Sequence, residues 1–271
     1  TEKHVFEALK YGIDVLWIGA RTTVNPFAMQ ALADALEGVD ITVLIKNPIN
    51  PELDLWLGAI ERIQKAGIRK IGAIHRGFSS YEKTAYRNQP KWQIPIELRQ
   101  RLPEIPLICD PSHMGGSKAF LLDLAQKSMD LNYDGLMIES HSDPESALSD
   151  KRQQIKPGEL SDLLDRIVLR NPESDDDKFL NSIEELRSQI DMYDDQLFEI
   201  LESRMMVAET IGRYKKEHSI TILQTNRWKE IVNKTVSKCA GKGLTREFIS
   251  TVLEAIHQES INRQMKVMNE K

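Results

Sequence analysis

Five short runs of apolar residues recur along the first half of the chain, and segments with a helical pattern separate them. The runs begin about 30 residues apart, and strands that alternate with helices at such a spacing form parallel βαβ units. Because each run is apolar throughout, we expect both faces of every strand to be covered. The runs are 13–19 (IDVLWIG), 41–45 (ITVLI), 71–74 (IGAI), 105–109 (IPLIC) and 135–138 (GLMI).

The ends of several helices can be read from their capping residues. The pairs 25–26 and 50–51 both read Asn-Pro, which places a cap residue before a proline at the first helical position. Gly38 and Gly67 lie where the helices that follow these pairs would end or turn back toward the sheet. Another helix is predicted at 1–10, where the apolar residues share one face.

The strand pattern stops at a short polar segment. Residues 171–178 (NPESDDDK) contain no apolar residue other than proline. We therefore expect two domains, an α/β domain at 1–170 and a helical domain at 179–271, with 171–178 as the linker between them.

The helical domain begins with an unusually long periodic segment. Residues 179–217 keep apolar residues at helical spacing, with no proline and no glycine before Gly212. One helix of this length extends on the order of 58 Å, at 1.5 Å per residue. A domain of about 90 residues cannot bury such a stripe, so we expect a homodimer that pairs this helix with a second copy. Two more helices are predicted at 224–239 and 245–268.

Charge and composition exclude several classes of protein. The chain has 36 Lys and Arg against 41 Asp and Glu, a net charge of −5, which argues against a nucleic-acid-binding protein. No apolar run approaches the roughly 20 residues that span a bilayer, and no cationic leader is visible, so we expect a cytoplasmic protein. Two cysteines, Cys109 and Cys239, are too few for a disulfide framework.

A charged side chain follows each apolar run, at the point where the strand would end. In a parallel barrel these carboxyl ends open on one face, which carries the chemistry. Three cations there suit a phosphorylated substrate, and a histidine beside carboxylates suits a divalent metal. A single charge after a buried strand is usually the chain reaching water, so the interpretation depends on the whole set. The set is Arg21, Lys46, Arg76, Asp110, His113 and Glu139.

Six motifs in this part of the chain resemble type I 3-deoxy-D-arabino-heptulosonate 7-phosphate (DAHP) synthase in order and spacing. They are IGART at 18–22, IKN at 45–47, HRG at 75–77, CDPSH at 109–113, MIESH at 137–141 and ALSD at 147–150. The resemblance implies condensation of phosphoenolpyruvate with erythrose 4-phosphate. It implies that phosphoenolpyruvate is held by Arg21, Lys46 and Arg76. It also implies a divalent transition metal such as manganese, with the ligands His113, Glu139 and Asp150.

The sequence also departs from that family. The family's barrel has eight strands, whereas five are visible here, and neither its GPCS motif, with a cysteine metal ligand, nor its KPRTS loop occurs. We therefore expect a partial TIM (β/α)8-type barrel, truncated at its amino end, with an impaired synthase site from which the metal has been lost or is weakly held. Cys109 lies at the buried end of a strand, before Asp110, and is interpreted as a core residue rather than a replacement ligand.

Cations on the long helix are spaced as in an anion pocket. Arg204 and Lys215 are 11 residues apart, so they share a face at about 16 Å along the axis. Arg187 lies about 100° round the helix from Arg204, so it can serve only a site in a partner chain. Isolated cations usually mark a solvated face. Two further pairs face the same way on their helices, namely Gln224 with Arg227 and Ser260 with Gln264.

These residues resemble the all-helical chorismate mutase family, which forms intertwined dimers and converts chorismate to prephenate. The motifs are LRSQID at 186–191, ESR at 202–204, GRYK at 212–215, Arg227, and ES-x-x-x-Q at 259–264. The reaction is pericyclic, so the pocket acts by fixing the reactive conformer and presenting positive charge, without a cofactor.

The resemblance implies a role for each residue of the pocket. Arg204 and Arg187 of the partner subunit bind the two carboxylates, and Lys215 and Gln264 contact the ether oxygen. Arg227 and Ser260 complete the pocket. Trp228 stands where the family often has a glutamate, so Gln224 is expected to take part of the contact with the substrate hydroxyl.

Two other interpretations of the helical domain remain open at this point. It is either a regulatory module that binds chorismate or prephenate and controls the barrel, or a bare dimerisation domain. For the barrel, the alternative is the related synthase that uses arabinose 5-phosphate. A fused chorismate mutase would make no metabolic sense for that enzyme, which argues against this alternative.

Overall fold

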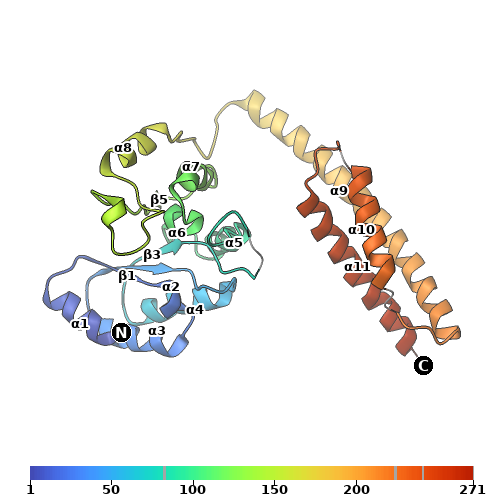
Figure 1. Ribbon diagram of the computed structural model, residues 1–271, viewed down its shortest axis with the longest axis horizontal. Helices are drawn as coiled ribbons and strands as arrows, with labels where there is room; N and C mark the ends of the chain where they lie inside the picture. The colour runs from blue at the N-terminus through green and yellow to red at the C-terminus, as the bar shows by residue number, and fades with distance from the viewer. Residues whose placement is uncertain (82–83, 223–224, 240, 271) are drawn as a thin grey trace. The chain divides into compact units, whose positions relative to one another are not determined.

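The chain folds into two compact units, Thr1–Glu173 and Ser174–Lys271 (Figure 1). A computed structural model describes residues 1–81, 84–222, 225–239 and 241–270. No helix in these ranges is long and apolar enough to cross a membrane.

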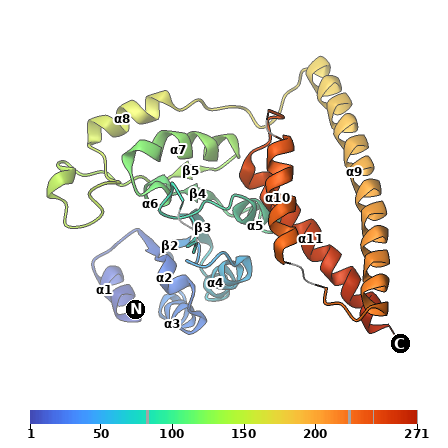
Figure 2. The same cartoon turned by 45° about the vertical axis from the view of Figure 1, so that its right-hand side comes forward.

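The first unit is built on five strands that pair in parallel and follow one another in chain order (Figure 2). This confirms the predicted parallel sheet of a partial barrel. Every pairing puts the carboxyl ends at the same edge, as in the alignment of Lys46 with Ile74 and of His75 with Cys109. The strands are β1 (Val15–Ile18), β2 (Thr42–Lys46), β3 (Lys70–His75), β4 (Leu107–Cys109) and β5 (Gly135–Leu136).

Helices connect the strands, as right-handed parallel crossovers require. Neighbouring helices pack on one another, α1 on α3, α3 on α4 and α4 on α5. The α-helices are α1 (Glu2–Lys10), α2 (Ala20–Thr23), α3 (Pro26–Leu36), α4 (Leu53–Lys65), α5 (Gln93–Arg101), α6 (Pro111–Gly115), α7 (Leu121–Asp130) and α8 (Pro157–Arg166). Two short 3-10 helices are η1 (Lys118–Phe120) and η2 (Pro144–Ser146).

One of the two predicted Asn-Pro helix starts is confirmed. The Asn25 side chain accepts hydrogen bonds from the first backbone N–H groups of α3, with Pro26 at the first helical position. At 50–51 the prediction is wrong, because α4 begins at Leu53 after Glu52. The carbonyl of Ile49 accepts a hydrogen bond from the N–H of Ser79, which holds this segment as a loop beside the end of the next strand.

The prediction that both faces of every strand are covered is wrong for β1. Val15 is 41% exposed and Trp17 is 62% exposed, whereas Ile18 on the other face is buried. The strand lies at the edge of the sheet, with β2 as its hydrogen-bonded neighbour, so fewer side chains reach its outer face than reach β2 or β3. In contrast, Val43 and Ile45 on β2 are fully buried.

The second unit has the three predicted helices, α9 (Asp177–Glu217), α10 (Thr225–Cys239) and α11 (Arg246–Asn269). The long helix has 41 residues and begins at Asp177, because the Asp176 carboxylate accepts hydrogen bonds from its first N–H groups. The second half of α9 packs against α11. The two helices come close at Gly212, where an added Cβ would lie 3.1 Å from the Cα of Gln264.

The first half of α9 carries an exposed apolar stripe. A stripe of this length on a helix is typical of a surface that packs against another chain. Its members are Leu180, Leu186, Ile190, Tyr193 and Leu197, each about half exposed.

Candidate functional sites

The carboxyl edge of the sheet brings together six of the charged side chains considered above. We call this group the rim site; it consists of Lys46, Arg76, Asp110, His113, Glu139 and Asp150. Lys46 is the last residue of β2, Arg76 and Asp110 directly follow β3 and β4, His113 lies on α6, and Glu139 and Asp150 lie in the segment after β5; parallel pairing aligns these strand ends. Arg21 lies on α2, directly after β1, with an exposed side chain.

Lys46 is the most buried cation of the rim site. The residue is 8% exposed, and its Nζ lies 2.8 Å from Oδ2 of Asp110, which is 1% exposed. Burial alone would raise the pKa of Asp110, but its contacts with His113 and Lys46 lower it. The carboxylate is therefore held ionised between two partners.

Arg76 is held by two buried asparagines. Its backbone N–H donates to Oδ1 of Asn47 at 2.7 Å, and its Nη1 donates to Oδ1 of Asn88 at 2.8 Å. Nδ2 of Asn88 donates in turn to the carbonyl of His113 at 2.6 Å, which ties the arginine to α6. Burial lowers the pKa of Arg76, and the negative charge of Asp110 acts in the opposite direction.

His75, the residue before Arg76, is fully buried and anchors this edge of β3. Its Nε2 lies 2.6 Å from the carbonyl of Pro90 and its Nδ1 lies 2.9 Å from the hydroxyl of Tyr133. A carbonyl only accepts, so Nε2 carries the proton and Nδ1 accepts from the tyrosine. Burial lowers the pKa of His75 to about 3, so the imidazole is neutral.

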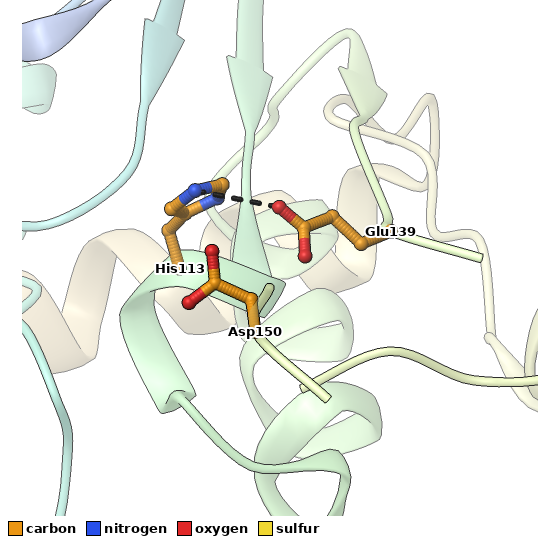
Figure 3. A group of neighbouring side chains, drawn as sticks. All are labelled: His113, Glu139 and Asp150. Carbon is orange, nitrogen blue, oxygen red and sulfur yellow. Dashed lines mark ion pairs between the residues drawn. The ribbon is translucent and has the colours of Figure 1, made fainter. Parts of the chain in front are cut away.

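His113, Glu139 and Asp150 form a group that could hold a metal ion (Figure 3). One ligand atom from each lies within 4.8 Å of the others. Nε2 of His113 lies 3.4 Å from Oε1 of Glu139, and the ribbon places the three residues on separate segments that converge (Figure 3). The structure thus brings together the three residues that the resemblance implied.

The donor set fits a divalent transition metal. One imidazole nitrogen and two carboxylates are ligands that manganese and related ions accept. Nδ1 of His113 is buried without an aligned hydrogen bond and lies 2.8 Å from Oδ2 of Asp110, which leaves Nε2 toward the carboxylates. A metal-binding histidine commonly has a carboxylate at its other nitrogen in this way.

Cys109 takes no part in this site. Its thiol is buried in the core, and burial raises its pKa to about 12, so it stays a neutral thiol. The interpretation of Cys109 as a core residue agrees with this burial.

Two residues that sequence reasoning missed hold the carboxylates in place. Nη1 of Arg87 lies 2.6 Å from Oδ1 of Asp150 and 2.7 Å from Oε1 of Gln153. Nε2 of Gln153 donates to Oε2 of Glu139 at 3.0 Å. The hydrogen bond from Arg87 lowers the pKa of Asp150. Both residues lie in loops, where no periodic pattern marks them.

The second unit has a cavity of about 370 Å³ between the second half of α9 and α11. Four residues predicted for the mutase pocket line it, namely Arg204, Lys215, Ser260 and Gln264. Nη1 of Arg204 donates to Oγ of Ser260 at 2.5 Å, and Nζ of Lys215 donates to the carbonyl of Ile222 at 2.6 Å. Oε1 of Gln264 is buried and has no partner among the described residues. The cavity therefore offers two cations and an unused polar atom.

His257 also lines the cavity and was not predicted. Its ring stacks on Trp228 at 4.5 Å between centroids, with the planes 19° apart. Arg187 is exposed and lies 3.7 Å from Glu184 on the same helix, away from the residues that line this cavity. Gln224 and the side chain of Arg227 lie outside the described residues.

Sequence models of two protein families match the chain. The model described as "DAHP synthetase I family" matches residues 2–169, and the model described as "Chorismate mutase type II" matches residues 186–265.

Individual proteins that are similar to this chain cover about half to three fifths of it. A phospho-2-dehydro-3-deoxyheptonate aldolase from Thermotoga maritima is 29% identical over 142 residues, which is 52% of this chain and 40% of that protein. A solved structure described as a truncated form of 3-deoxy-D-arabino-heptulosonate 7-phosphate synthase from Thermotoga maritima has a TM-score of 0.52 at 26% identity, covering 61% of this chain and 60% of that chain.

A second solved structure is the phospho-2-dehydro-3-deoxyheptonate aldolase (DAHP synthase) of the same organism. It has a TM-score of 0.53 at 26% identity, covering 62% of this chain and 47% of that chain. The chain thus spans less than two thirds of the length of each of these proteins.

The buried neutral His75 predicts a loss of stability in acid. The unfolded imidazole takes up a proton as the pH falls through about 6.5, whereas the folded one does so only near pH 3. The contribution is therefore complete above pH 6.5 and is lost as the pH falls toward 3. Between pH 7 and pH 5 the free energy of unfolding should fall about 2 kcal/mol more in the wild type than in His75→Gln.

Urea unfolding at the two pH values, followed by tryptophan fluorescence, measures this difference, because Trp56 and Trp92 lie beside the imidazole. The matched control is His4→Gln, since His4 is exposed on α1 and lies outside the core. Equal losses in the wild type and in His75→Gln would contradict the prediction.

Proposed function

Because the chain belongs to the DAHP synthetase I family over residues 2–169 and matches type II chorismate mutase over 186–265, we propose that it serves two reactions of aromatic biosynthesis. The first unit takes part in the condensation of phosphoenolpyruvate with erythrose 4-phosphate. The second unit rearranges chorismate to prephenate.

The synthase proposal depends mainly on the rim site. Three potential metal ligands lie within 4.8 Å of one another, next to the buried pair of Lys46 with Asp110. Cations and a metal site on one edge of a parallel sheet suit a phosphorylated, anionic substrate. This juxtaposition of the two sites carries the proposal.

Each residue of the first unit has a defined task in this proposal. Arg21, Lys46 and Arg76 bind the phosphate and carboxylate of phosphoenolpyruvate and neutralise their charge. His113, Glu139 and Asp150 would hold a divalent metal such as manganese, which would supply Lewis-acid polarisation of a carbonyl group. Asn47 and Asn88 keep Arg76 in position, so little conformational freedom is lost when the anion binds.

Binding of phosphoenolpyruvate tests the role of Arg76. Arg76→Ala should weaken the affinity at least tenfold, since a charge-assisted hydrogen bond contributes about 1.5–3 kcal/mol. Isothermal titration calorimetry of the 271-residue chain measures the dissociation constant. Arg69→Ala is the matched control, because Arg69 precedes β3 whereas Arg76 follows it, and it is exposed.

The two substitutions should differ because they lie at opposite ends of one strand. Equal weakening by both would show that the protein attracts the anion by its general charge, and the proposed site would be wrong.

The mutase proposal depends mainly on the cavity between α9 and α11. Arg204 and Lys215 supply two positive charges to a space whose other polar lining residues are His257, Ser260 and Gln264. A dicarboxylate with an ether oxygen fits this combination, because positive charge near that oxygen stabilises the transition state. Gln264 and Lys215 face the ether oxygen in this proposal, and Arg204 binds a carboxylate. Arg227 and Ser260 complete the pocket, and Gln224 takes part of the contact with the substrate hydroxyl.

Turnover of chorismate tests this pocket. Arg204→Ala and Lys215→Ala should each lower kcat/KM at least a hundredfold, which is typical for loss of one preorganised donor. Arg213→Ala is the control on the same helix, since Arg213 is exposed and lies 4.0 Å from Glu209 at the surface. The decrease of chorismate absorbance gives the rate.

The same experiment separates the alternatives. The match to the mutase family favours an enzyme over a regulatory module. Tight binding of prephenate without turnover would instead support the module, and ligand affinities unchanged in Arg204→Ala would support a bare dimerisation domain.

We also propose a homodimer through the long helix. The apolar stripe on the first half of α9 is exposed. Arg187 lies in the same half of the helix, beside the stripe. In an antiparallel pair of these helices, Arg187 would enter the cavity of the other copy and bind the second carboxylate.

Complementation tests this arrangement. Arg187→Ala and Arg204→Ala are each expected to be nearly inactive, yet a mixture refolded at equal concentrations should regain about a quarter of wild-type activity. Half of the dimers would be mixed, and one of the two sites in each mixed dimer would have both arginines. No recovery on mixing would show that both arginines serve one chain.

A further inference from the structure

Asp110 lies at the centre of the rim site without being a metal ligand in the group described above. It follows β4 directly and caps α6, where its Oδ1 accepts from the backbone N–H of His113 at 3.0 Å. Its other oxygen, Oδ2, lies 2.8 Å from Nζ of Lys46 and 2.8 Å from Nδ1 of His113. One oxygen atom thus contacts both the substrate cation and the metal histidine.

The two contacts compete for the same negative charge. A carboxylate beside the outer nitrogen of a metal-binding histidine makes the other nitrogen a better ligand. A lysine at 2.8 Å from the same oxygen draws that charge away from the imidazole. The effect is strong here because Asp110 is 1% exposed and Lys46 is 8% exposed, so water screens neither.

An anion bound at Lys46 changes this balance. The ammonium group has three N–H donors, and a phosphate or carboxylate that takes the free ones neutralises its charge. Oδ2 then acts on His113 alone. The imidazole should therefore bind a metal more tightly when an anionic substrate occupies Lys46.

We propose that Asp110 is a positioning residue that couples anion binding at Lys46 to metal binding at His113. The coupling is reciprocal, so a bound metal strengthens anion binding by the same factor. This inference rests on the metal and phosphoenolpyruvate sites of the proposed function and adds the route by which the two are linked. As a result, the state of the first unit with both the metal and the anion bound is favoured over the states with only one of them bound.

Direct attraction between the anion and the metal also produces coupling, so the test must isolate the route through Asp110. Two substitutions do so because they act in opposite directions. Asp110→Asn removes the charge that supports His113 at nearly constant volume. Lys46→Met removes the cation that competes for that charge.

The experiment titrates the 271-residue chain with Mn²⁺, with and without saturating phosphoenolpyruvate, and measures free Mn²⁺ by its electron paramagnetic resonance signal. In the wild type, phosphoenolpyruvate should tighten Mn²⁺ binding at least fivefold. Asp110→Asn should weaken Mn²⁺ binding by about 10- to 100-fold and reduce the effect of phosphoenolpyruvate below twofold. Asp123→Asn, an exposed carboxylate on α7, should change neither quantity.

Lys46→Met provides the sharper result. In the absence of phosphoenolpyruvate, Lys46→Met should tighten Mn²⁺ binding several-fold. If the pair of Lys46 with Asp110 only stabilised the fold, the same substitution would weaken Mn²⁺ binding. In the double variant with Asp110→Asn this gain should disappear, since its route is gone. Circular dichroism and thermal midpoints establish that each variant is folded. If Asp110→Asn does not fold, Lys46→Met alone decides, and weaker Mn²⁺ binding in it overturns the inference.

Failure of this inference differs from failure of the proposed function. If the wild type binds Mn²⁺ and phosphoenolpyruvate but Asp110→Asn keeps their full coupling, or if Lys46→Met gains equally in both backgrounds, only the route through Asp110 is wrong. If His113→Ala binds Mn²⁺ as the wild type does, the metal site itself is wrong and the inference with it.

Discussion

The parallel pairing of five strands is the constraint on which the first unit depends. It fixes where the residues after each strand lie, because the carboxyl ends of parallel strands are aligned at one edge of the sheet. Lys46 and Asp110 are 64 residues apart in the chain, yet this pairing brings them to 2.8 Å. The edge strand β1 pairs with β2, and its residues Val15 and Trp17 stay exposed.

How much of this could be predicted from the sequence depends on whether a residue follows a regular element. Apolar runs mark the strands, so the residues after them, such as Lys46 and His113, are predictable as a group. Arg87 and Gln153 are not, because they lie in loops, and their contacts with Asp150 and Glu139 arise only in the folded chain. The wrong helix start at 50–51 has the same origin, since a contact with the neighbouring loop overrides the local capping signal.

In the second unit, helical periodicity alone predicted that two cations share one face of the long helix. Arg204 and Lys215 line one cavity because 11 residues make almost three full turns. The periodicity could not show how the pocket is closed on its other side, where His257 stacks on Trp228. Such a contact joins two helices, and its existence depends on the packing angle between them rather than on spacing within either.

The two proposed anion sites differ in how their cations are balanced, and the difference suits the two kinds of chemistry proposed for them. Lys46 is buried and already paired with a carboxylate, which keeps the cost of its burial low and makes its charge sensitive to what binds nearby. Arg204 and Lys215 instead contact the uncharged groups Ser260 Oγ and the Ile222 carbonyl, so their full charge is available to a dicarboxylate. A metal-assisted condensation gains from linked binding steps. A pericyclic rearrangement gains from a fixed positive field, because a C–O bond breaks and a C–C bond forms within the bound molecule while no proton or group passes to the protein.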